Sequence, residues 1–146
     1  MKKLLILLLL LTIQANYAQE ADVKKTIKTF FEGLQTRDTI KMQSVCYKHL
    51  ILESIEEHRG QGNLDFEAAA DFYKQIARIP QDNEIEERLL SYNIQIDGTM
   101  AHVWAPYEFY INGKLSHAGV NSFQLFNDRG AWKIVYIIDT RRSAKK

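Results

Sequence analysis

Asp139 and Tyr107 are the side chains of this sequence best suited to acid–base chemistry. If the loop before the last strand holds four residues, Asp139 lies opposite Ala118 and beside Tyr107. An aspartate among aromatic rings is desolvated, which raises its pKa and allows it to act as a general acid or base. A slip of one residue would turn Asp139 to the other face of the sheet. The alternative role for Asp139 is an ion pair with Arg141 or Arg142 near the sheet end.

Glu108 and His117 form a second pair that could transfer a proton. A two-residue hairpin loop at 112–113 sets Glu108 opposite His117 and Trp104 opposite Asn121. A cross-strand ion pair is the simpler interpretation of Glu108 and His117. Because a large aromatic face with fixed polar groups is rarely left in water, we expect a homodimer with these four residues at its interface. A structural domain that binds another protein through the face around Trp104 is the alternative.

Metal and cofactor chemistry have little support in this sequence. No metal-ligand spacing links the four histidines, which are His49, His58, His102 and His117. His102 and His117 share a face of the sheet but would lie roughly 20 Å apart, too far for one ion. Cys46 is the only cysteine, so it forms no disulfide within the chain and is expected in the core. We therefore predict no metal site and no cofactor.

The N-terminus has the features of a secretory signal peptide. Lys2 and Lys3 precede an apolar run from Leu4 to Leu11, which ends in a polar stretch that contains the small residue Ala18. The run is too short for a membrane span, which needs roughly 20 apolar residues. We predict a signal peptide at 1–18 and one domain at 19–146, exported to the periplasm or secreted, with no membrane span after cleavage.

Size and charge limit the class of the exported part. It is long enough for one hydrophobic core and too short for two domains. Loss of Lys2 and Lys3 leaves 17 basic side chains against 18 acidic ones. A net charge near zero gives no electrostatic basis for binding nucleic acid.

Hydrophobic periodicity predicts an α+β domain with helices on one face of an antiparallel sheet. In Asp22–Gln35, residues such as Val23, Ile27 and Phe30 form one apolar stripe, and Pro80 ends the last helix. The predicted helices are 22–35, 39–47 and 65–78. The predicted strands are 84–97, 100–111, 114–126 and 131–141.

Four segments of the chain resemble the nuclear transport factor 2-like superfamily. They are Gly98-Thr99-Met100-Ala101-His102-Val103-Trp104, Ala105-Pro106-Tyr107-Glu108-Phe109-Tyr110, the run 117–126, and the ending from Gly130 to Arg142. Within these segments, 98–104 and 130–135 resemble strand signatures of the superfamily. The segments 105–110, 117–126 and 136–142 are similar to exported bacterial members of the SnoaL-like type, which are often labelled as lumazine-binding. The resemblance covers the whole domain and implies a cone-shaped, cystatin-like fold in which three N-terminal helices pack on a curved antiparallel sheet. It also implies a pocket inside the cone and dimerisation through the other side of the sheet.

The hairpin registers predict which side chains face the helices. Turns at 98–99 and 112–113 place ten residues on one face: Leu90, Tyr92, Ile94, Val103, Ala105, Tyr107, Phe109, Ala118, Val120 and Ser122. The small side chains of Ala105 and Ala118 leave volume between this face and the helices. The residues expected to bind a ligand there are Phe30, Phe31, Tyr73, Tyr92, Tyr107 and Ser122.

Two functions are compatible with such a pocket. The first is an exported module that binds a small apolar or aromatic molecule, because the pocket is apolar and no catalytic group is assembled. The second, implied by enzymes of the same superfamily, is a cofactor-free isomerase, cyclase or dehydratase. In that enzyme Asp139 would be the acid or base and Tyr107 would donate a hydrogen bond to the developing oxyanion. Ligand class and reaction are not encoded in any motif of the sequence.

Overall fold

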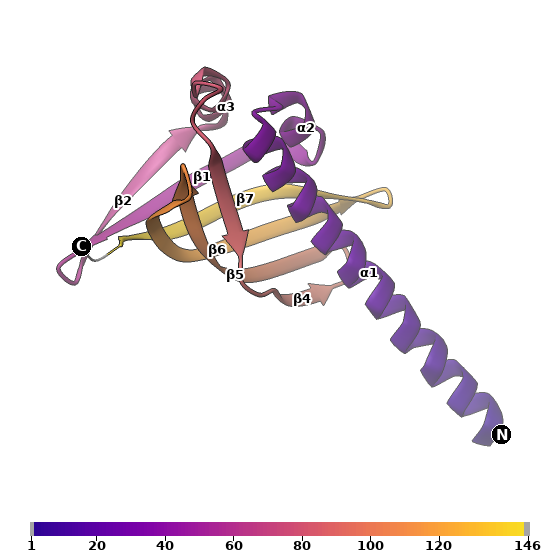
Figure 1. The fold of residues 1–146 in the computed structure, drawn as a ribbon. Helices are drawn as coiled ribbons and strands as arrows, with labels where there is room; N and C mark the ends of the chain where they lie inside the picture. Colours follow the sequence, from indigo (N-terminus) through magenta and orange to yellow (C-terminus); the bar gives the residue numbers. More distant parts are fainter. Residues whose placement is uncertain (1, 145–146) are drawn as a thin grey trace.

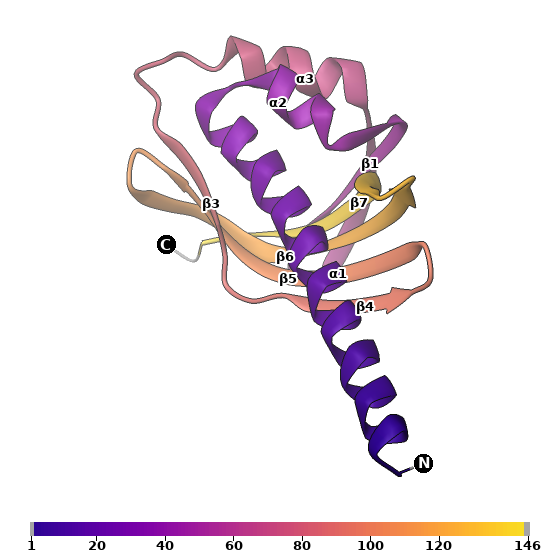
Figure 2. The same ribbon diagram turned by 90° about the vertical axis from the view of Figure 1, so that its right-hand side faces the viewer.

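The computed structural model describes residues 2–144, and the side chains of residues 17–144. Three helices lie on one side of a curved, unclosed sheet (Figures 1 and 2). The elements in chain order are α1 (Lys2–Thr36), α2 (Thr39–Ser44), β1 (Cys46–His58), β2 (Gln61–Ala68), α3 (Ala69–Arg78), β3 (Ile85–Leu89), β4 (Asn93–Asp97), β5 (Met100–Ile111), β6 (Lys114–Asp128) and β7 (Ala131–Ser143). This is the predicted α+β class.

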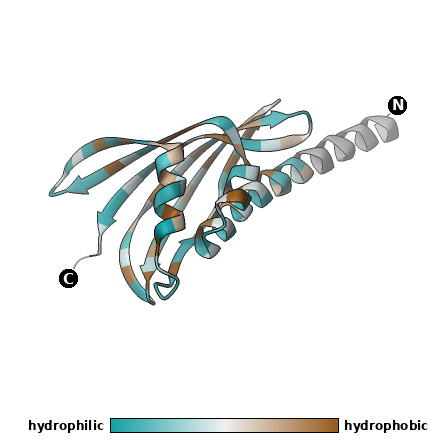
Figure 3. Ribbon diagram, turned by 90° about the horizontal axis from the view of Figure 1, so that it is seen from above, coloured by the Kyte–Doolittle hydropathy of each residue, from teal (hydrophilic) through white to brown (hydrophobic). Residues whose placement is uncertain are grey.

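The sheet has seven strands in the order β2-β1-β7-β6-β5-β3, and β4 pairs with β5 beyond the end of β3. All neighbours are antiparallel except β1 and β7, which run parallel. Apolar and polar residues alternate along the strands (Figure 3). We call the side of the sheet that meets the helices the inner face and the opposite side the outer face.

The core lies between α1 and the inner face. Val23, Ile27, Phe30 and Leu34 recur every three or four residues along α1, and all four are buried. They pack with Val103, Phe123, Leu125 and Ile134 of the sheet in one cluster. The apolar stripe predicted for the first helix is therefore confirmed.

Three predicted elements differ from the structure between α1 and β5. The predicted helix 39–47 ends at Ser44, because Cys46 and Tyr47 belong to β1. The segment Asp65–Ala68 belongs to β2, so α3 begins at Ala69 and Phe66 is exposed instead of packing in the core. The predicted strand 84–97 is split into β3 and β4. As a result Leu89, and not Leu90, pairs with Tyr107. Ile94 pairs with Val103 and Ile96 with Ala101, which is the register that the predicted turn at 98–99 requires.

Two β-bulges change the predicted registers. On β6 the extra residue is Ser116, because Tyr110 pairs with Leu115 while Phe109 pairs with His117. Tyr107 therefore pairs with Gly119 and not with Ala118. From His117 onward each side chain of β6 points to the face of the sheet opposite to the one predicted, because one extra residue exchanges the two faces of a strand.

The second bulge lies on β7 at Val135. Leu125 pairs with Ile134 and Gln124 with Tyr136, so Val135 is the extra residue. The loop before β7 holds two residues and not four, because Asp128 pairs with Ala131. Asp139 consequently lies opposite Asn121. The two register errors cancel for Asp139, which lies on the inner face as predicted.

The predicted signal peptide falls within α1, and the side chains before Tyr17 lie outside the described residues. Cleavage after Ala18 stays a prediction. Among the described residues, no helix combines the length and the apolar character needed to cross a membrane.

Candidate functional site

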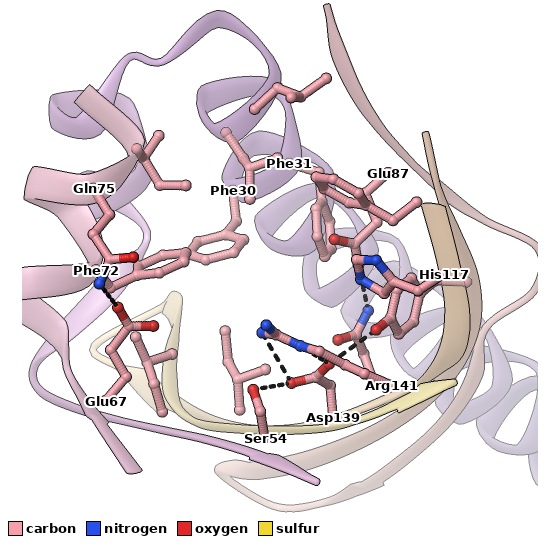
Figure 4. Close-up of a pocket in the computed structure, with 18 of the residues that line it drawn as sticks. Phe30, Phe31, Ser54, Glu67, Phe72, Gln75, Glu87, His117, Asp139 and Arg141 are labelled. Atoms are coloured by element: carbon pink, nitrogen blue, oxygen red, sulfur yellow. Dashed lines mark hydrogen bonds and ion pairs between the residues drawn. The ribbon is translucent and has the colours of Figure 1, made fainter. Parts of the chain in front are cut away.

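A cavity of about 370 Å³ lies between the helices and the inner face of the sheet. Its apolar side includes Phe30, Phe31 and Leu34 of α1, Phe72, Ile76 and Ile79 near α3, and Leu52, Ile85, Phe109 and Ile137 of the sheet. Its polar side is formed by Glu53, Ser54, Glu67, Gln75, Glu87, Tyr107, His117, Asn121, Asp139 and Arg141. In Figure 4 the rings of Phe30 and Phe31 face Asp139 and Arg141 across the open volume. The size is within the range of small-molecule sites.

Asp139 is the centre of a hydrogen-bond network on the polar side. Its Oδ2 accepts the hydroxyl of Tyr107 at 2.9 Å and the Nε–H of Arg141 at 2.8 Å. Its Oδ1 accepts the hydroxyl of Ser54 at 2.5 Å. Because Asp139 is buried, these donors replace the water that a carboxylate would otherwise bind. The network fixes the carboxylate and neutralises it through Arg141.

Gly119 allows Tyr107 to reach Asp139 from two strands away. Tyr107 pairs with Gly119. Because Gly119 has no side chain, the ring of Tyr107 can extend over β6. A Cβ at Gly119 would lie 1.7 Å from the carbonyl oxygen of Thr140, so only glycine fits there. The Tyr107 hydroxyl also lies 3.1 Å from that carbonyl oxygen. Burial, with the carboxylate of Asp139 beside it, raises the pKa of Tyr107, so the phenol stays protonated and donates.

Glu87 is a second carboxyl of the cavity, half-buried on β3, and sequence reasoning missed it. It lies on β3 opposite Phe109, and its Oε1 accepts the Asn121 side-chain amide at 2.6 Å. Burial, opposed by that amide and assisted by the charge of Asp139, raises the pKa of Glu87 to about 8. Glu87 therefore carries a proton at neutral pH. The available signal was the alternation Ile85, Glu87, Leu89, which places a charged residue at an inward position.

His117 adds an imidazole to the cavity. Its ring stacks on Phe109 with centroids 4.9 Å apart and meets the edge of Tyr107 at 5.8 Å. Burial and the positive charge of Arg141 lower the pKa of His117, which favours the neutral imidazole. Figure 4 shows Glu87 and His117 on the same side of the cavity, and the two pKa shifts favour the protonated carboxyl and the neutral imidazole there.

The structure brings some of the predicted site residues together and not others. Phe30, Phe31, Tyr107 and Asp139 line the cavity as predicted. Tyr73, Tyr92 and Ser122 do not line it. Tyr73 packs beside Phe72, the ring of Tyr92 lies 4.6 Å from the ammonium of Lys24, and Ser122 contacts His102 on the outer face.

The predicted interface set is divided between the two faces of the sheet. Trp104 lies on the outer face with 49% of its surface exposed, and Glu108, on the same face, accepts the hydroxyl of Tyr110 at 2.7 Å. The placement of His117 and Asn121 on that face is wrong, because the bulge at Ser116 turns both into the cavity. The predicted Glu108–His117 pair is also wrong, since Glu108 pairs with Ala118.

The remaining candidates for chemistry in the sequence are the Cys46 thiol and metal-ligating side chains. Burial raises the pKa of the Cys46 thiol to about 11, which opposes a nucleophilic role. Within residues 17–144 no group of three or more His, Cys, Asp or Glu side chains is arranged to hold a metal ion.

Neither a protein-family model nor a curated protein matches the sequence. Solved structures match over most of the chain. One is an NTF2-like protein of unknown function from Shewanella baltica OS155, with 16% identity over 88% of this chain and 98% of that chain and a TM-score of 0.63. Another, described as a candidate dehydratase of the NTF2-like family, comes from Streptomyces avermitilis, with 14% identity over 88% and 99% and a TM-score of 0.67.

A third similar structure is the beta subunit of a candidate aromatic-ring-hydroxylating dioxygenase from Novosphingobium aromaticivorans DSM 12444. It shares 9% identity over 90% of this chain and 94% of that chain, with a TM-score of 0.72. Structural similarity at sequence identities this low shows a shared fold and does not show a shared activity. These likenesses, together with the curved sheet and its helices, show that the chain has the NTF2-like fold.

Proposed function

We propose that this protein is a small-molecule-binding module whose ligand is largely apolar or aromatic. The observation that carries the proposal is the cavity of about 370 Å³ with an aromatic wall on one side and fixed polar groups on the other. Apolar sites with a few placed polar groups are the usual form of small-molecule pockets. Phe30, Phe31 and Phe72 would hold the body of the ligand by burial, and the polar side would orient it.

The test is native mass spectrometry of the protein isolated from the cells that naturally make it, followed by denaturation to release bound compounds. We expect a stoichiometric small molecule that is lost on denaturation. Gln75 both lines the cavity and is exposed, so it lies at the opening. Gln75→Trp should therefore abolish copurification of the molecule. Lys74→Trp, on the same helix but outside the lining, is the matched control. Equal occupancy in both variants contradicts the proposal.

A second candidate, a cofactor-free enzyme of the isomerase, cyclase or dehydratase type, is favoured by Glu87. A carboxyl with a pKa near 8 inside a pocket is suited to proton transfer at neutral pH. Asp139 and Tyr107 are less available for the roles predicted from sequence, because the hydroxyl of Tyr107 donates to Asp139. Incubation of the released compound with the protein in D2O tests this candidate. Deuterium uptake or conversion with the wild type, lost in Glu87→Gln, supports it; an unchanged compound refutes it.

Export and dimerisation complete the proposal. The N-terminal pattern around Lys2, Lys3 and Ala18 supports export to the periplasm or secretion. The exposed Trp104 on the outer face supports a homodimer through that face. Cell fractionation with N-terminal sequencing tests the first part. Sedimentation of the wild type and Trp104→Glu tests the second, and a monomeric wild type would overturn it.

A further inference from the structure

The cavity carries more acidic than basic groups. Four of its lining residues are carboxylic acids: Glu53, Glu67, Glu87 and Asp139. Arg141 is the one Lys or Arg among the lining residues, all of which belong to the described part of the chain. His117 does not restore the balance, because burial lowers its pKa and favours the neutral ring. Three carboxyls are therefore left without a matching cation in the lining.

The contacts of each carboxyl show where the excess lies. Arg141 is taken by Asp139, with Nε 2.8 Å from Oδ2. The other three accept hydrogen bonds from neutral groups. Glu87 accepts the amide of Asn121 at 2.6 Å, Glu67 accepts the amide of Gln75 at 2.5 Å, and Glu53 accepts the hydroxyl of Tyr136. Neutral donors satisfy part of each carboxyl but supply no positive charge, so Glu53 and Glu67 have no cation beside them in the lining and Glu87 holds a proton instead of one.

Of these three carboxyls, Glu87 is the best placed to pair with a ligand among the aromatic rings. It lies in the same row of the sheet as Phe109 and His117, whereas Glu67 lies on the opposite side of the cavity beside Gln75 (Figure 4). The rings of Phe30 and Phe31 meet edge to face at 5.4 Å and line the space near both carboxyls. Aromatic faces attract organic cations and also bury apolar bodies.

We propose that the ligand of this pocket is an organic cation, a molecule with an aromatic or aliphatic body and a basic amine, whose ammonium group is paired by Glu87 among the aromatic rings. This inference rests on the proposed function and names its ligand class. An anionic ligand would face the carboxyls of Glu53, Glu67 and Glu87, and the guanidinium that could attract it is held by Asp139. A neutral ligand would leave the acidic excess without a partner.

Binding of such a cation is coupled to release of a proton. Since burial raises the pKa of Glu87 to about 8, the empty pocket holds Glu87 as the neutral acid at pH 7. When the ammonium pairs with it, the carboxyl loses its proton to the buffer and the positive charge of the ligand replaces that proton. No covalent bond changes in the ligand. Affinity should therefore rise with pH between 6 and 8.

The experiment compares three probes with the same aromatic body: 1-naphthylmethylamine, 1-naphthylmethanol and 1-naphthoate. Isothermal titration calorimetry at pH 7, in phosphate and in Tris, gives both affinity and proton release. We expect the amine to bind at least about tenfold more tightly than the alcohol, the naphthoate to bind most weakly, and nearly one proton to be released per amine. Glu87→Gln should remove the preference for the amine and the proton release while alcohol affinity changes less than about threefold.

Glu86→Gln is the matched control, because Glu86 is the neighbouring carboxyl on β3 and is paired with Arg88 outside the lining. It should retain the preference for the amine. Melting curves of both variants verify that they are folded. Equal or tighter binding of the alcohol overturns the charge inference and leaves the proposed function intact. A preference for the amine that persists in Glu87→Gln overturns the role of Glu87. If none of the probes binds, both the charge inference and the proposed function are overturned.

Discussion

Replacement of Glu87 by glutamine should make the protein more stable at alkaline pH. Glutamine has nearly the same shape as the protonated glutamic acid and still offers an oxygen to the amide of Asn121, which lies 2.6 Å from Oε1 in the wild type. It cannot ionise. The variant therefore keeps the neutral state that the cavity favours and removes the penalty for carrying a charge there.

The magnitude and sign follow from the proton affinity of Glu87. Its pKa rises from the ordinary value of 4.5 to about 8 on folding, so the folded state binds the proton more tightly than the unfolded state. The associated stability is fully present below pH 4.5 and is lost as the pH rises through about 8. Each tenfold change in proton affinity is worth about 1.4 kcal/mol, so the loss approaches about 5 kcal/mol. The Glu87→Gln protein should be less than about 1 kcal/mol from the wild type at pH 5 and several kcal/mol more stable at pH 9.

Urea denaturation at pH 5, 7 and 9, followed by circular dichroism, measures this difference directly. Other ionisable groups contribute equally to both proteins and cancel in the comparison. Glu86→Gln, which changes a carboxyl on the same strand that is paired with Arg88 outside the cavity, should follow the pH dependence of the wild type. If the wild type and Glu87→Gln lose stability in parallel between pH 5 and 9, Glu87 is ionised in the folded protein and the reasoning from burial fails.

Two further substitutions and one labelling experiment test the packing and chemistry of the fold. Gly119→Ala should lower the free energy of unfolding in urea by more than about 2 kcal/mol, because its Cβ would lie 1.7 Å from the Thr140 carbonyl oxygen; unchanged stability would contradict the close approach of the strands. Asp139→Ala should cost about 2 kcal/mol by the same measurement, since it removes the acceptor of the Tyr107 and Ser54 hydroxyls and the partner of Arg141. Cys46 should react slowly with iodoacetamide at pH 8 when folded and quickly in urea, because burial raises its pKa to about 11. Mass spectrometry of the labelled protein at timed intervals distinguishes the two rates, and equal rates would refute burial of the thiol.

The parts of the fold that could be predicted from the sequence depend on short-range physics. The stripe of Val23, Ile27 and Phe30 is a local consequence of helical periodicity, and it is buried as predicted. Gly98 and Gly113 adopt positive φ angles of 58° and 71°, which two-residue hairpin loops require. Both hairpins therefore form where the sequence indicates. Each of these features is decided by a few neighbouring residues.

The parts that could not be predicted depend on contacts between distant residues. No local sequence motif predicts the extra residues Ser116 and Val135, because a bulge is stabilised by contacts with the strands on both sides. One bulge is enough to exchange the faces of His117, Asn121 and Ser122. Glu87 was missed for a related reason: a glutamate in a strand is ordinarily exposed, and only its partner Asn121 makes its inward position acceptable.

The polar residues of the cavity themselves explain why this register is adopted. In the register without the bulge at Ser116, Ala118 and Ser122 would face the helices and the Asn121 amide would point outward, leaving Glu87 buried without a donor. A buried carboxyl without a hydrogen bond costs more than the local distortion of a bulge. With the bulge in place, Asn121 reaches Glu87 and the residue opposite Tyr107 is Gly119, the residue that tolerates the close approach of Thr140. The groups that give the pocket its chemistry are thus also groups that select the sheet register, so changes to Asn121 should disturb ligand binding and strand pairing together.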